Sequence, residues 1–483
     1  MNIKDWEIVI GLEVHVELSS KSKIFCSCTT EFGGEPNSHC CPICAGLPGT
    51  LPVLNEKVFE FAVKAGLALN CEIIKYNKFD RKNYYYPDLP KAYQISQLYL
   101  PFAVDGCVDI STESGEKSIR IRIHEIHIEE DAGKLVHSEL RDVSYPDYNR
   151  CGVPLLEIVS EPDFRSAEEV LAYLEQIKLI FEYLEISDCK MEEGSMRVDV
   201  NLSIRHIGDK KLGTRTETKN LNSFRAIKRA IAYESRRQIE VLENGGKIVQ
   251  QTRRWDDDEN TGYVMRSKEN AQDYRYFPEP DIPPLLLTED YISNIKNNQP
   301  ELSEEKKQRY IKDYGLLDYD ASILTADKNL AVFFECVVKD CEEPKEAANW
   351  LIVHAMRLMN DNKITPKDLK FSPSVLADLI KIIGEGKINR TVGYNIFEMI
   401  FNAGDVDINA YINENNLGMF DDIEIIREIA ARIIAADSDS LKKYKAGKTK
   451  VFAAFVGQVM REFKGKANPD IVNKILEEEI RKN

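Results

Sequence analysis

The amino-terminal segment "WEIVIGLEVHVEL" alternates apolar and polar residues from position 6 to position 18. Isoleucine, leucine and valine fill the even-numbered positions from Ile8 onward, and the odd-numbered positions include Glu13, His15 and Glu17. A period of two in such residues predicts a strand with one buried face. Because side chains two residues apart on a strand project the same way, we expect these three polar side chains to share the other face.

Further periodic segments follow in the first 292 residues. The segment "GSMRVDVNLSIRH" alternates in the same way and has Arg197 and Asp199 at its polar positions. Helical periodicity begins after Ser166 and again after Ser223, both of which are suitable N-cap residues. Strands outnumber helices and short turns join several of them, so we predict an α+β fold with a mainly antiparallel sheet.

The pattern becomes helical after the proline cluster "YFPEPDIPPL". A dip near "FNAGDVDINAYINENNLG" divides this second part of the chain. We therefore predict an α+β domain over residues 1–292, a helical domain over 293–405 and a helical C-terminal domain over 406–483.

Charge and composition narrow the classes of function. A formal net charge of −16 over 483 residues argues against coating nucleic acid by bulk electrostatics. A local basic patch near the C-terminus includes Lys445, Lys448 and Lys464, and it is either a nucleic-acid contact or a solvated helix face. The N-terminus has no signal-peptide pattern and no segment is apolar enough to span a bilayer, so we expect a cytoplasmic protein without a membrane partner.

Five of the eleven cysteines lie within nineteen residues of one another. Cys26 and Cys28 form one close pair, and Cys41 and Cys44 form another twelve residues later. Two pairs of thiolates are typical of a closed tetrahedral zinc site, which is structural and has no open position. Reduced bystander cysteines and a redox role are the alternatives.

A second group of polar residues interrupts the apolar phase of "IRIRIHEIHIEEDAGK". The isoleucines shift from odd to even positions, which requires a bulge or bend near His124, and an acidic run that includes Glu130 follows. Glu157 lies inside the apolar run "GVPLLEIVSEPD", where a lone carboxylate is costly to bury unless a positive group meets it. Exposed strand faces often carry charge, so the pattern alone leaves a solvated face open.

Several carboxylates with one imidazole suit a hard cation such as Mg²⁺, and Mg²⁺ suggests phosphate chemistry. The sequence contains no P-loop, no dinucleotide-binding glycine motif and no nucleophile elbow. Lys82 and Lys219 are candidate phosphate clamps. The run Tyr84–Tyr86 either stacks on a base or belongs to the core.

Longer motifs resemble a known family over essentially the whole chain and in the expected order. They include "IGLEVHVEL", "CPICAGLPGTLPVLN", "FDRKNYYYPDLPKAYQISQ", "HIEEDAGK", "MEEGSMRVDVN", "DYRYFPEPDIPP" and the tail "YKAGKTKVFAAFVGQVMREFKGKANPDIVNKIL". These are similar to the B subunits of bacterial and archaeal-type aspartyl/glutamyl-tRNA(Asn/Gln) amidotransferases. The segment "SYPDYNRCG" departs from the family pattern at Tyr145 and Pro146, which we expect to alter a loop only.

The resemblance implies that residues 1–292 form a cradle-like catalytic domain, that residues 293–405 form a linker domain, and that the helical tail over residues 406–483 contacts tRNA. ATP would phosphorylate the side-chain carboxylate of Glu or Asp misacylated onto tRNA(Gln) or tRNA(Asn), and ammonia would then displace phosphate. Carried over by position, the catalytic Mg²⁺ ligands are Glu13, His15, Glu130 and Glu157. Nucleotide or substrate contacts are Lys82, Arg197, Asp199 and Lys219, and Asp199 is also a candidate for a second divalent site. Zinc would be held by Cys26, Cys28, Cys41 and Cys44, and tRNA by Lys445, Lys448 and Lys464.

Ammonia must come from a partner, because nothing in the sequence resembles a glutaminase. The family uses an amidase A subunit together with a small C subunit. Two other classes of function compete with this interpretation. One is a Mg²⁺-dependent hydrolase acting on RNA, and the other is a noncatalytic, zinc-stapled protein that binds tRNA within an assembly.

Overall fold

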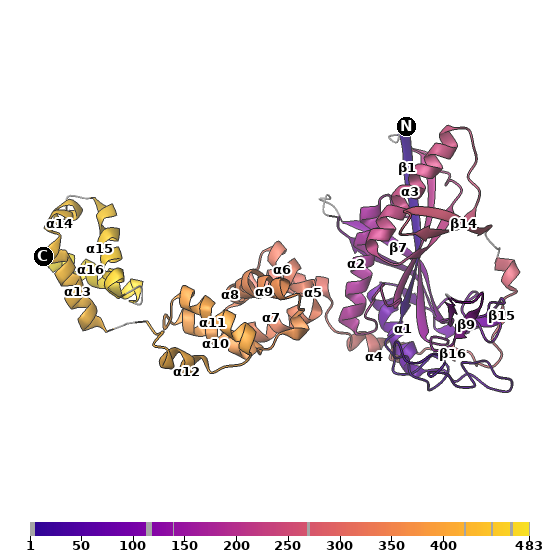
Figure 1. Ribbon diagram of the computed structural model, residues 1–483, viewed down its shortest axis with the longest axis horizontal. Coiled ribbons are helices and arrows are strands. Elements are labelled where there is room, and N and C mark those ends of the chain that lie inside the picture. The colour runs from indigo at the N-terminus through magenta and orange to yellow at the C-terminus, as the bar shows by residue number, and fades with distance from the viewer. Residues whose placement is uncertain are drawn as a thin grey trace. The chain divides into compact units, whose positions relative to one another are not determined.

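The computed structural model describes residues 5–112, 118–138, 140–267, 271–419, 422–445, 448–463 and 467–482. It forms two compact units that meet in the sequence between Leu302 and Ser303. The first unit contains the sheets and the second is built from helices, as Figure 1 shows. The predicted α+β fold, a mainly antiparallel sheet followed by helical domains, is confirmed. Within the described residues, no helix is both long and apolar enough to cross a membrane.

A nine-stranded sheet organises the first unit, and only the contact between β12 and β13 is parallel. In spatial order its strands are β14 (Thr261–Ser267), β13 (Gln251–Asp256), β12 (Thr216–Leu221), β11 (Met196–His206), β1 (Trp6–Glu17), β10 (Pro154–Ser160), β7 (Ile119–Glu130), β6 (Ala103–Ile110) and β2 (Glu72–Ile73). Three small sheets accompany it: β15 (Phe277–Pro278) with β4 (Asp80–Asn83) and β5 (Tyr93–Ser96), β16 (Leu285–Leu286) with β3 (Tyr76–Asn77), and β8 (Lys134–His137) with β9 (Ser144–Asp147). A 3₁₀ turn spans Ala271–Tyr274.

One face of the large sheet is apolar and packs against helices. The apolar positions of β1, β10 and β11 share a single buried core with α1 (Glu56–Ala68), α2 (Ala167–Leu184) and α3 (Phe224–Glu243), which lie on one side of the sheet (Figure 1). Ser166 and Ser223 cap α2 and α3 as predicted, each accepting a hydrogen bond from the backbone N–H three residues later. The period-two pattern thus places the opposite face of the sheet away from these helices.

The first unit extends past the predicted boundary at residue 292. Helix α4 (Glu289–Asn297) packs on α1, and its Ile295 belongs to the core of the sheet. The side chain of Gln299 also donates a hydrogen bond to the backbone of Lys64 in α1. The unit therefore ends only where α5 begins, at Ser303.

The predicted interruption in β7 is a bulge at His124. Val159 pairs with Glu125, but the next residue of β10 pairs with Ile123, which leaves His124 as the extra residue. After the bulge, Ile126 and Ile128 are buried in the core. The alternate positions that begin at Glu125 therefore lie on the polar face of the sheet.

The described elements of the second unit are helices around two separate apolar cores, one over residues 310–412 and one over residues 426–480. The first core is formed from α5 (Ser303–Tyr314), α6 (Asp318–Thr325), α7 (Lys328–Cys341), α8 (Pro344–Asn349), a π-helical turn (Trp350–Ala355), α9 (Met356–Asn362), α10 (Pro373–Gly384), α11 (Arg390–Ala403) and α12 (Ile408–Glu414). A 3₁₀ turn (Pro366–Asp368) lies between α9 and α10 in the sequence. The second is formed from α13 (Ile423–Ala436), α14 (Ser438–Lys445), a 3₁₀ turn (Thr449–Val451), α15 (Phe452–Glu462) and α16 (Pro469–Lys482).

Candidate active site

The polar face of the large sheet carries charged side chains from five neighbouring strands, β7, β10, β1, β11 and β12. In the antiparallel register His15 is opposite Glu157 on one side and Arg197 on the other, and Glu13 is opposite Asp199. Directly opposite residues of neighbouring strands share a face of the sheet. The alternation seen in the sequence therefore brings residues from distant segments together in one row.

A first group on this face consists of His15, Glu129 and Glu157. The imidazole Nε2 of His15 lies 3.6 Å from a carboxylate oxygen of Glu129 and 3.9 Å from one of Glu157. One ligand atom from each of the three residues lies within 4.8 Å of the other two, which is close enough for a shared metal ion. Glu129 is buried, whereas His15 and Glu157 remain partly accessible.

The pKa values of the two carboxylates in this group are shifted in opposite directions. Burial and the neighbouring charge of Glu157 raise the pKa of Glu129. Burial also acts on Glu157, but the charges of His15, His127 and Lys82 hold the pKa of Glu157 below its usual value. Two such carboxylates repel each other in a buried site, and a bound cation would relieve that repulsion.

His127 is a positive group beside these carboxylates. Its Nε2 lies 3.0 Å from a carboxylate oxygen of Glu125, and its Nδ1 contacts the backbone oxygen of Gln97. Burial lowers the pKa of His127, but the Glu125 hydrogen bond and the charge of Glu157 outweigh it and raise the pKa to about 9. His127 therefore adds positive charge to the polar face near neutral pH.

A second acidic group consists of Glu13, Asp199 and Glu217, again with ligand atoms within 4.8 Å of one another. The amide of Asn201 donates a hydrogen bond of 2.9 Å to Glu13, while burial and the neighbouring carboxylates raise the pKa of Glu13. The ammonium of Lys219 pairs with Asp199 and lies 3.0 Å from Glu217. This group therefore already holds one cation of the protein itself.

Glu130 is not part of either group, although the sequence resemblance assigned it as a magnesium ligand. Its carboxylate pairs with Lys91 and accepts a hydrogen bond of 2.9 Å from the backbone N–H of Ile95. Glu130 is two residues after Ile128 on β7, so its side chain projects to the same side as Ile128, away from the polar face. Glu129 lies on the polar face, beside His15.

Two further predicted residues lie among charged or aromatic neighbours. The ammonium of Lys82 lies 5.1 Å from the ring centre of Tyr274 and 5.9 Å from that of Tyr84. Arg197 donates a hydrogen bond of 2.8 Å to Asp131, while its Nε is buried and has no hydrogen-bond partner among the described residues. That unmet donor is suited to an incoming oxygen anion.

Burial lowers the pKa of Lys82, but nearby tyrosines and the carboxylates of Glu129 and Glu157 outweigh it and raise the pKa above its usual value. The Lys82 side chain is therefore a cation held beside the first acidic group.

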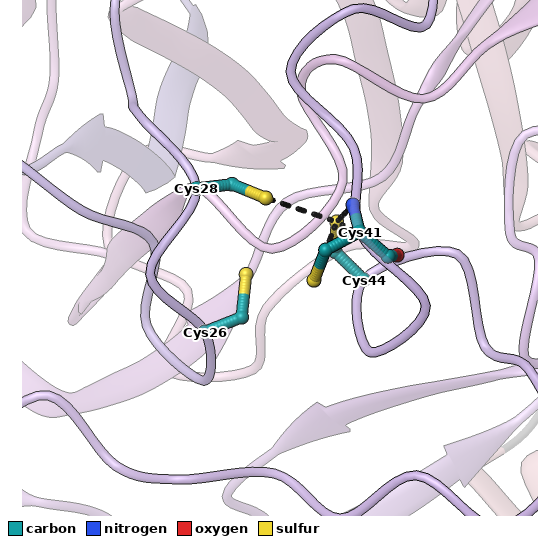
Figure 2. Close-up of side chains that lie close together, drawn as sticks. All are labelled: Cys26, Cys28, Cys41 and Cys44. Atoms are coloured by element: carbon teal, nitrogen blue, oxygen red, sulfur yellow. Dashed lines mark hydrogen bonds between the residues drawn. The ribbon is translucent and has the colours of Figure 1, made fainter.

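The two cysteine pairs form one cluster, as Figure 2 shows. The sulfur of Cys44 lies 4.0 Å from that of Cys28 and 3.9 Å from that of Cys41. Four sulfurs each about 2.3 Å from a central zinc ion would be about 3.8 Å apart, so the cluster fits tetrahedral zinc. Hydrogen bonding with Cys26 outweighs burial and lowers the pKa of Cys44 to about 4, while the same hydrogen bond and burial raise the pKa of Cys26.

The predicted basic patch is only partly described. Lys445 is the last residue of α14, and Lys448 is exposed. Lys464 lies outside the described residues. The grouping of these three lysines therefore stays a prediction.

Glu129, His127 and Glu217 were not among the predicted ligands, although the sequence contains a signal for each. Glu129 and His127 follow from the apolar phase after the bulge, which puts odd-numbered residues on the polar face. Glu217 stands two residues before Lys219 in the alternating segment "TETKNL", so the two side chains share a face.

Comparison with known proteins identifies the family. Residues 8–293 match the model of the GatB/GatE catalytic domain, and residues 332–480 match that of the GatB domain. A protein of Lachnoclostridium phytofermentans, named as the B subunit of aspartyl/glutamyl-tRNA(Asn/Gln) amidotransferase, is 58% identical over 480 residues, covering 99% of this chain and all of that protein. Proteins with the same name from Agathobacter rectalis and Caldicellulosiruptor bescii are 56% and 54% identical over 476 and 481 residues, with the same coverage. The chain belongs to the family of B subunits of the aspartyl/glutamyl-tRNA(Asn/Gln) amidotransferases.

Proposed function

We propose that this chain catalyses the ATP-dependent amidation of Glu on tRNA(Gln), Asp on tRNA(Asn) or both. The γ-phosphoryl group of ATP is transferred to an oxygen of the amino acid's side-chain carboxylate, which gives an acyl phosphate and ADP. Ammonia then attacks the acyl carbon, phosphate leaves and the amide remains. The observation that carries this proposal is the row of acidic residues and His15 on the polar face of the sheet, in a chain of this family.

Phosphate chemistry at this face requires a cation, and His15, Glu129 and Glu157 would hold Mg²⁺. Their three ligand atoms converge, and oxygen donors with one imidazole are an acceptable set for this ion. Burial and the neighbouring charge of Glu157 raise the pKa of Glu129, and a bound cation would favour its ionised form. Bound Mg²⁺ supplies compensation for the charge on the phosphoryl group. Glu13 lies two residues before His15 on β1, opposite Asp199, and completes the acidic row.

The chain's own cations would bind and orient the phosphates. Lys82 is held beside the first acidic group, and Lys219 beside the second. Arg197 is fixed by Asp131 and keeps one N–H available. Because phosphoryl transfer depends mainly on positioning and charge compensation, these three side chains account for binding the nucleotide and the acyl phosphate on one face.

Partner proteins and tRNA complete the reaction. Ammonia would come from an amidase A subunit that hydrolyses glutamine, with a small C subunit in the same assembly. The four cysteines would hold a structural zinc ion, because a site closed by four sulfurs has no position for substrate. Lys445, Lys448 and Lys464 would contact the tRNA backbone.

The test is an amidation assay of the reconstituted complex with Glu-tRNA(Gln) and Asp-tRNA(Asn) in separate reactions, with metal content measured on the same sample. We expect ADP to form only when the misacylated tRNA is present, in proportion to the amide produced. Cleaved tRNA without ADP would support an RNA hydrolase instead. A Glu157→Gln variant that retains full amidation would support the noncatalytic, tRNA-binding interpretation.

A further inference from the structure

A fully buried lysine contacts the cysteine cluster. Lys23 precedes the first cysteine pair, and none of its surface is exposed. Its ammonium donates a hydrogen bond of 2.8 Å to the backbone oxygen of His39 and lies 3.6 Å from the sulfur of Cys44 and 3.5 Å from the backbone oxygen of Tyr148. These three acceptors match the three N–H groups of an ammonium ion.

The chemistry of these acceptors makes the sulfur distinctive. A buried ammonium is costly unless it is both hydrogen-bonded and paired with a negative charge. Two of the three acceptors are neutral carbonyl oxygens, so among these contacts only the sulfur of Cys44 can carry a formal charge. The same sulfur accepts a hydrogen bond of 3.1 Å from the backbone N–H of Cys41. Cys44 is therefore a sulfur that the protein supports with two separate N–H donors.

Charge balance at a metal site explains this arrangement. Four thiolates around Zn²⁺ carry a net charge of −2, and a buried site must offset that excess or lose affinity for the metal. We propose that Lys23 is a positioning residue of the zinc site, whose ammonium hydrogen-bonds the Cys44 thiolate and offsets half of this negative charge. This inference rests on the proposed zinc site.

Lys23 also joins three parts of the chain that the zinc site must bring together. Its own segment leads into the first cysteine pair, His39 precedes the second pair, and Tyr148 follows β9. The backbone N–H of His39 is further tied to the side chain of Asn149 at 2.8 Å. A lysine that only held these segments together would need the two carbonyl contacts alone. The contact with the sulfur of Cys44 distinguishes a role at the zinc site from that structural role.

The experiment replaces zinc with Co²⁺ in the reconstituted complex and compares the parent protein with Lys23→Met, which keeps the aliphatic stem. Loss of a hydrogen bond to a coordinated thiolate raises the energy of its sulfur electrons. We therefore expect the sulfur-to-cobalt charge-transfer band to move to longer wavelength and zinc affinity to fall about 10- to 100-fold. An unmoved band with unchanged zinc affinity would overturn the proposal.

Further variants distinguish the loss of the Lys23–Cys44 contact from misfolding and from the absence of a zinc site. Lys23→Gln keeps an N–H donor without the charge, so if Lys23→Met does not accumulate, a loss of zinc affinity in Lys23→Gln is the expected result, and unchanged affinity overturns the proposal. Lys57→Met, on the exposed surface of α1, and Cys40→Ser, beside the second pair, are the matched controls and should bind zinc as the parent does. A parent protein that shows no sulfur-to-cobalt band would refute the zinc site, not the role of Lys23 within it.

Discussion

A buried carboxylate on the helix side of the large sheet and the carboxylates on its polar face differ in how the protein compensates their negative charge. On the helix side, Glu234 of α3 accepts hydrogen bonds from Thr216 at 2.7 Å, from Gln238 at 3.0 Å and from Arg237 at 2.6 Å. Arg253 lies 3.3 Å from its second oxygen. Burial opposes ionisation, but these partners outweigh it and lower the pKa of Glu234.

On the polar side, the carboxylates lie close to one another, and the neighbouring cations do not outweigh burial and repulsion at every one of them. The pKa values of Glu13 and Glu129 are raised by burial and by neighbouring carboxylates. A structural carboxylate is thus satisfied within the fold, whereas Glu13 and Glu129 keep raised pKa values beside the protein's own cations. In the proposed function, a bound divalent cation would favour the ionised forms of these carboxylates.

The largest expected effect comes from a substitution in the acidic row. Glu129→Gln should lower tRNA-dependent ADP formation by roughly a thousandfold or more, because it would remove a proposed ligand of the cation that offsets phosphoryl charge. Glutamine hydrolysis by the partner amidase should persist. Glu130→Gln is the matched control, since Glu130 is the next residue along the chain and its carboxylate pairs with Lys91 outside the acidic row. A larger loss of ADP formation in Glu130→Gln than in Glu129→Gln would contradict the assignment.

A substitution on the helix side should affect stability instead of chemistry. Glu234→Gln should destabilise the first unit by about 3 kcal/mol, because it leaves two arginines without their counter-charge. The folded pKa of Glu234 lies below its unfolded value of about 4.5, so its contribution is present above that pH and is lost as pH falls through the folded pKa. Urea unfolding of both proteins from neutral pH to about pH 3 measures this. A difference that stays constant with pH would contradict the network.

Removing a cation from the polar face should have a smaller effect. Lys219→Met should raise the KM for ATP about tenfold, because one charge-assisted hydrogen bond to phosphate is removed. Lys219→Arg preserves the charge and should recover part of the affinity. Steady-state ADP formation over a range of ATP concentrations provides the measurement. An unchanged KM in Lys219→Met would restrict this lysine to its ion pairs with Asp199 and Glu217.

The smallest expected effect concerns the C-terminal tail. It tests whether tRNA binding by the tail is independent of the chemistry at the acidic row. Replacing Lys445, Lys448 and Lys464 by Gln should weaken tRNA binding and flatten its salt dependence, with the log–log slope falling by about 0.7–0.9 for each phosphate that the protein no longer neutralises. ADP formation at saturating tRNA should stay unchanged. Filter binding at several salt concentrations tests this, and an unchanged slope would make the patch a solvated helix face.

Much of the site was predictable because hydrophobic periodicity fixes which face a strand residue occupies. The alternation of β1 and β11 assigned His15 and Asp199 to the polar face, and the register places them there. The phase change in β7 predicted the bulge at His124. Local sequence carries this information because one face of the sheet is buried.

Other features depended on contacts that the sequence does not display. The choice between Glu129 and Glu130 depends on which of them shares a face of the sheet with Ile126 and Ile128 after the bulge. The acidic run itself contains no apolar residue that would show this in the sequence. The end of the first unit moved past residue 292 because α4 packs back onto α1, more than two hundred residues earlier in the chain. The buried position of Lys23 was invisible because lysine is ordinarily a surface residue.

In the proposed function, the polar face of the sheet binds a divalent cation through Glu129, His15 and Glu157. Electron paramagnetic resonance of Mn²⁺, a substitute for Mg²⁺, measures this directly in titrations of the parent, Glu129→Gln and Glu130→Gln proteins. We predict that Glu129→Gln weakens Mn²⁺ binding at least about tenfold, whereas Glu130→Gln binds as the parent does. Equal Mn²⁺ affinity in the parent and in Glu129→Gln would show that Glu129 is not a ligand of the cation.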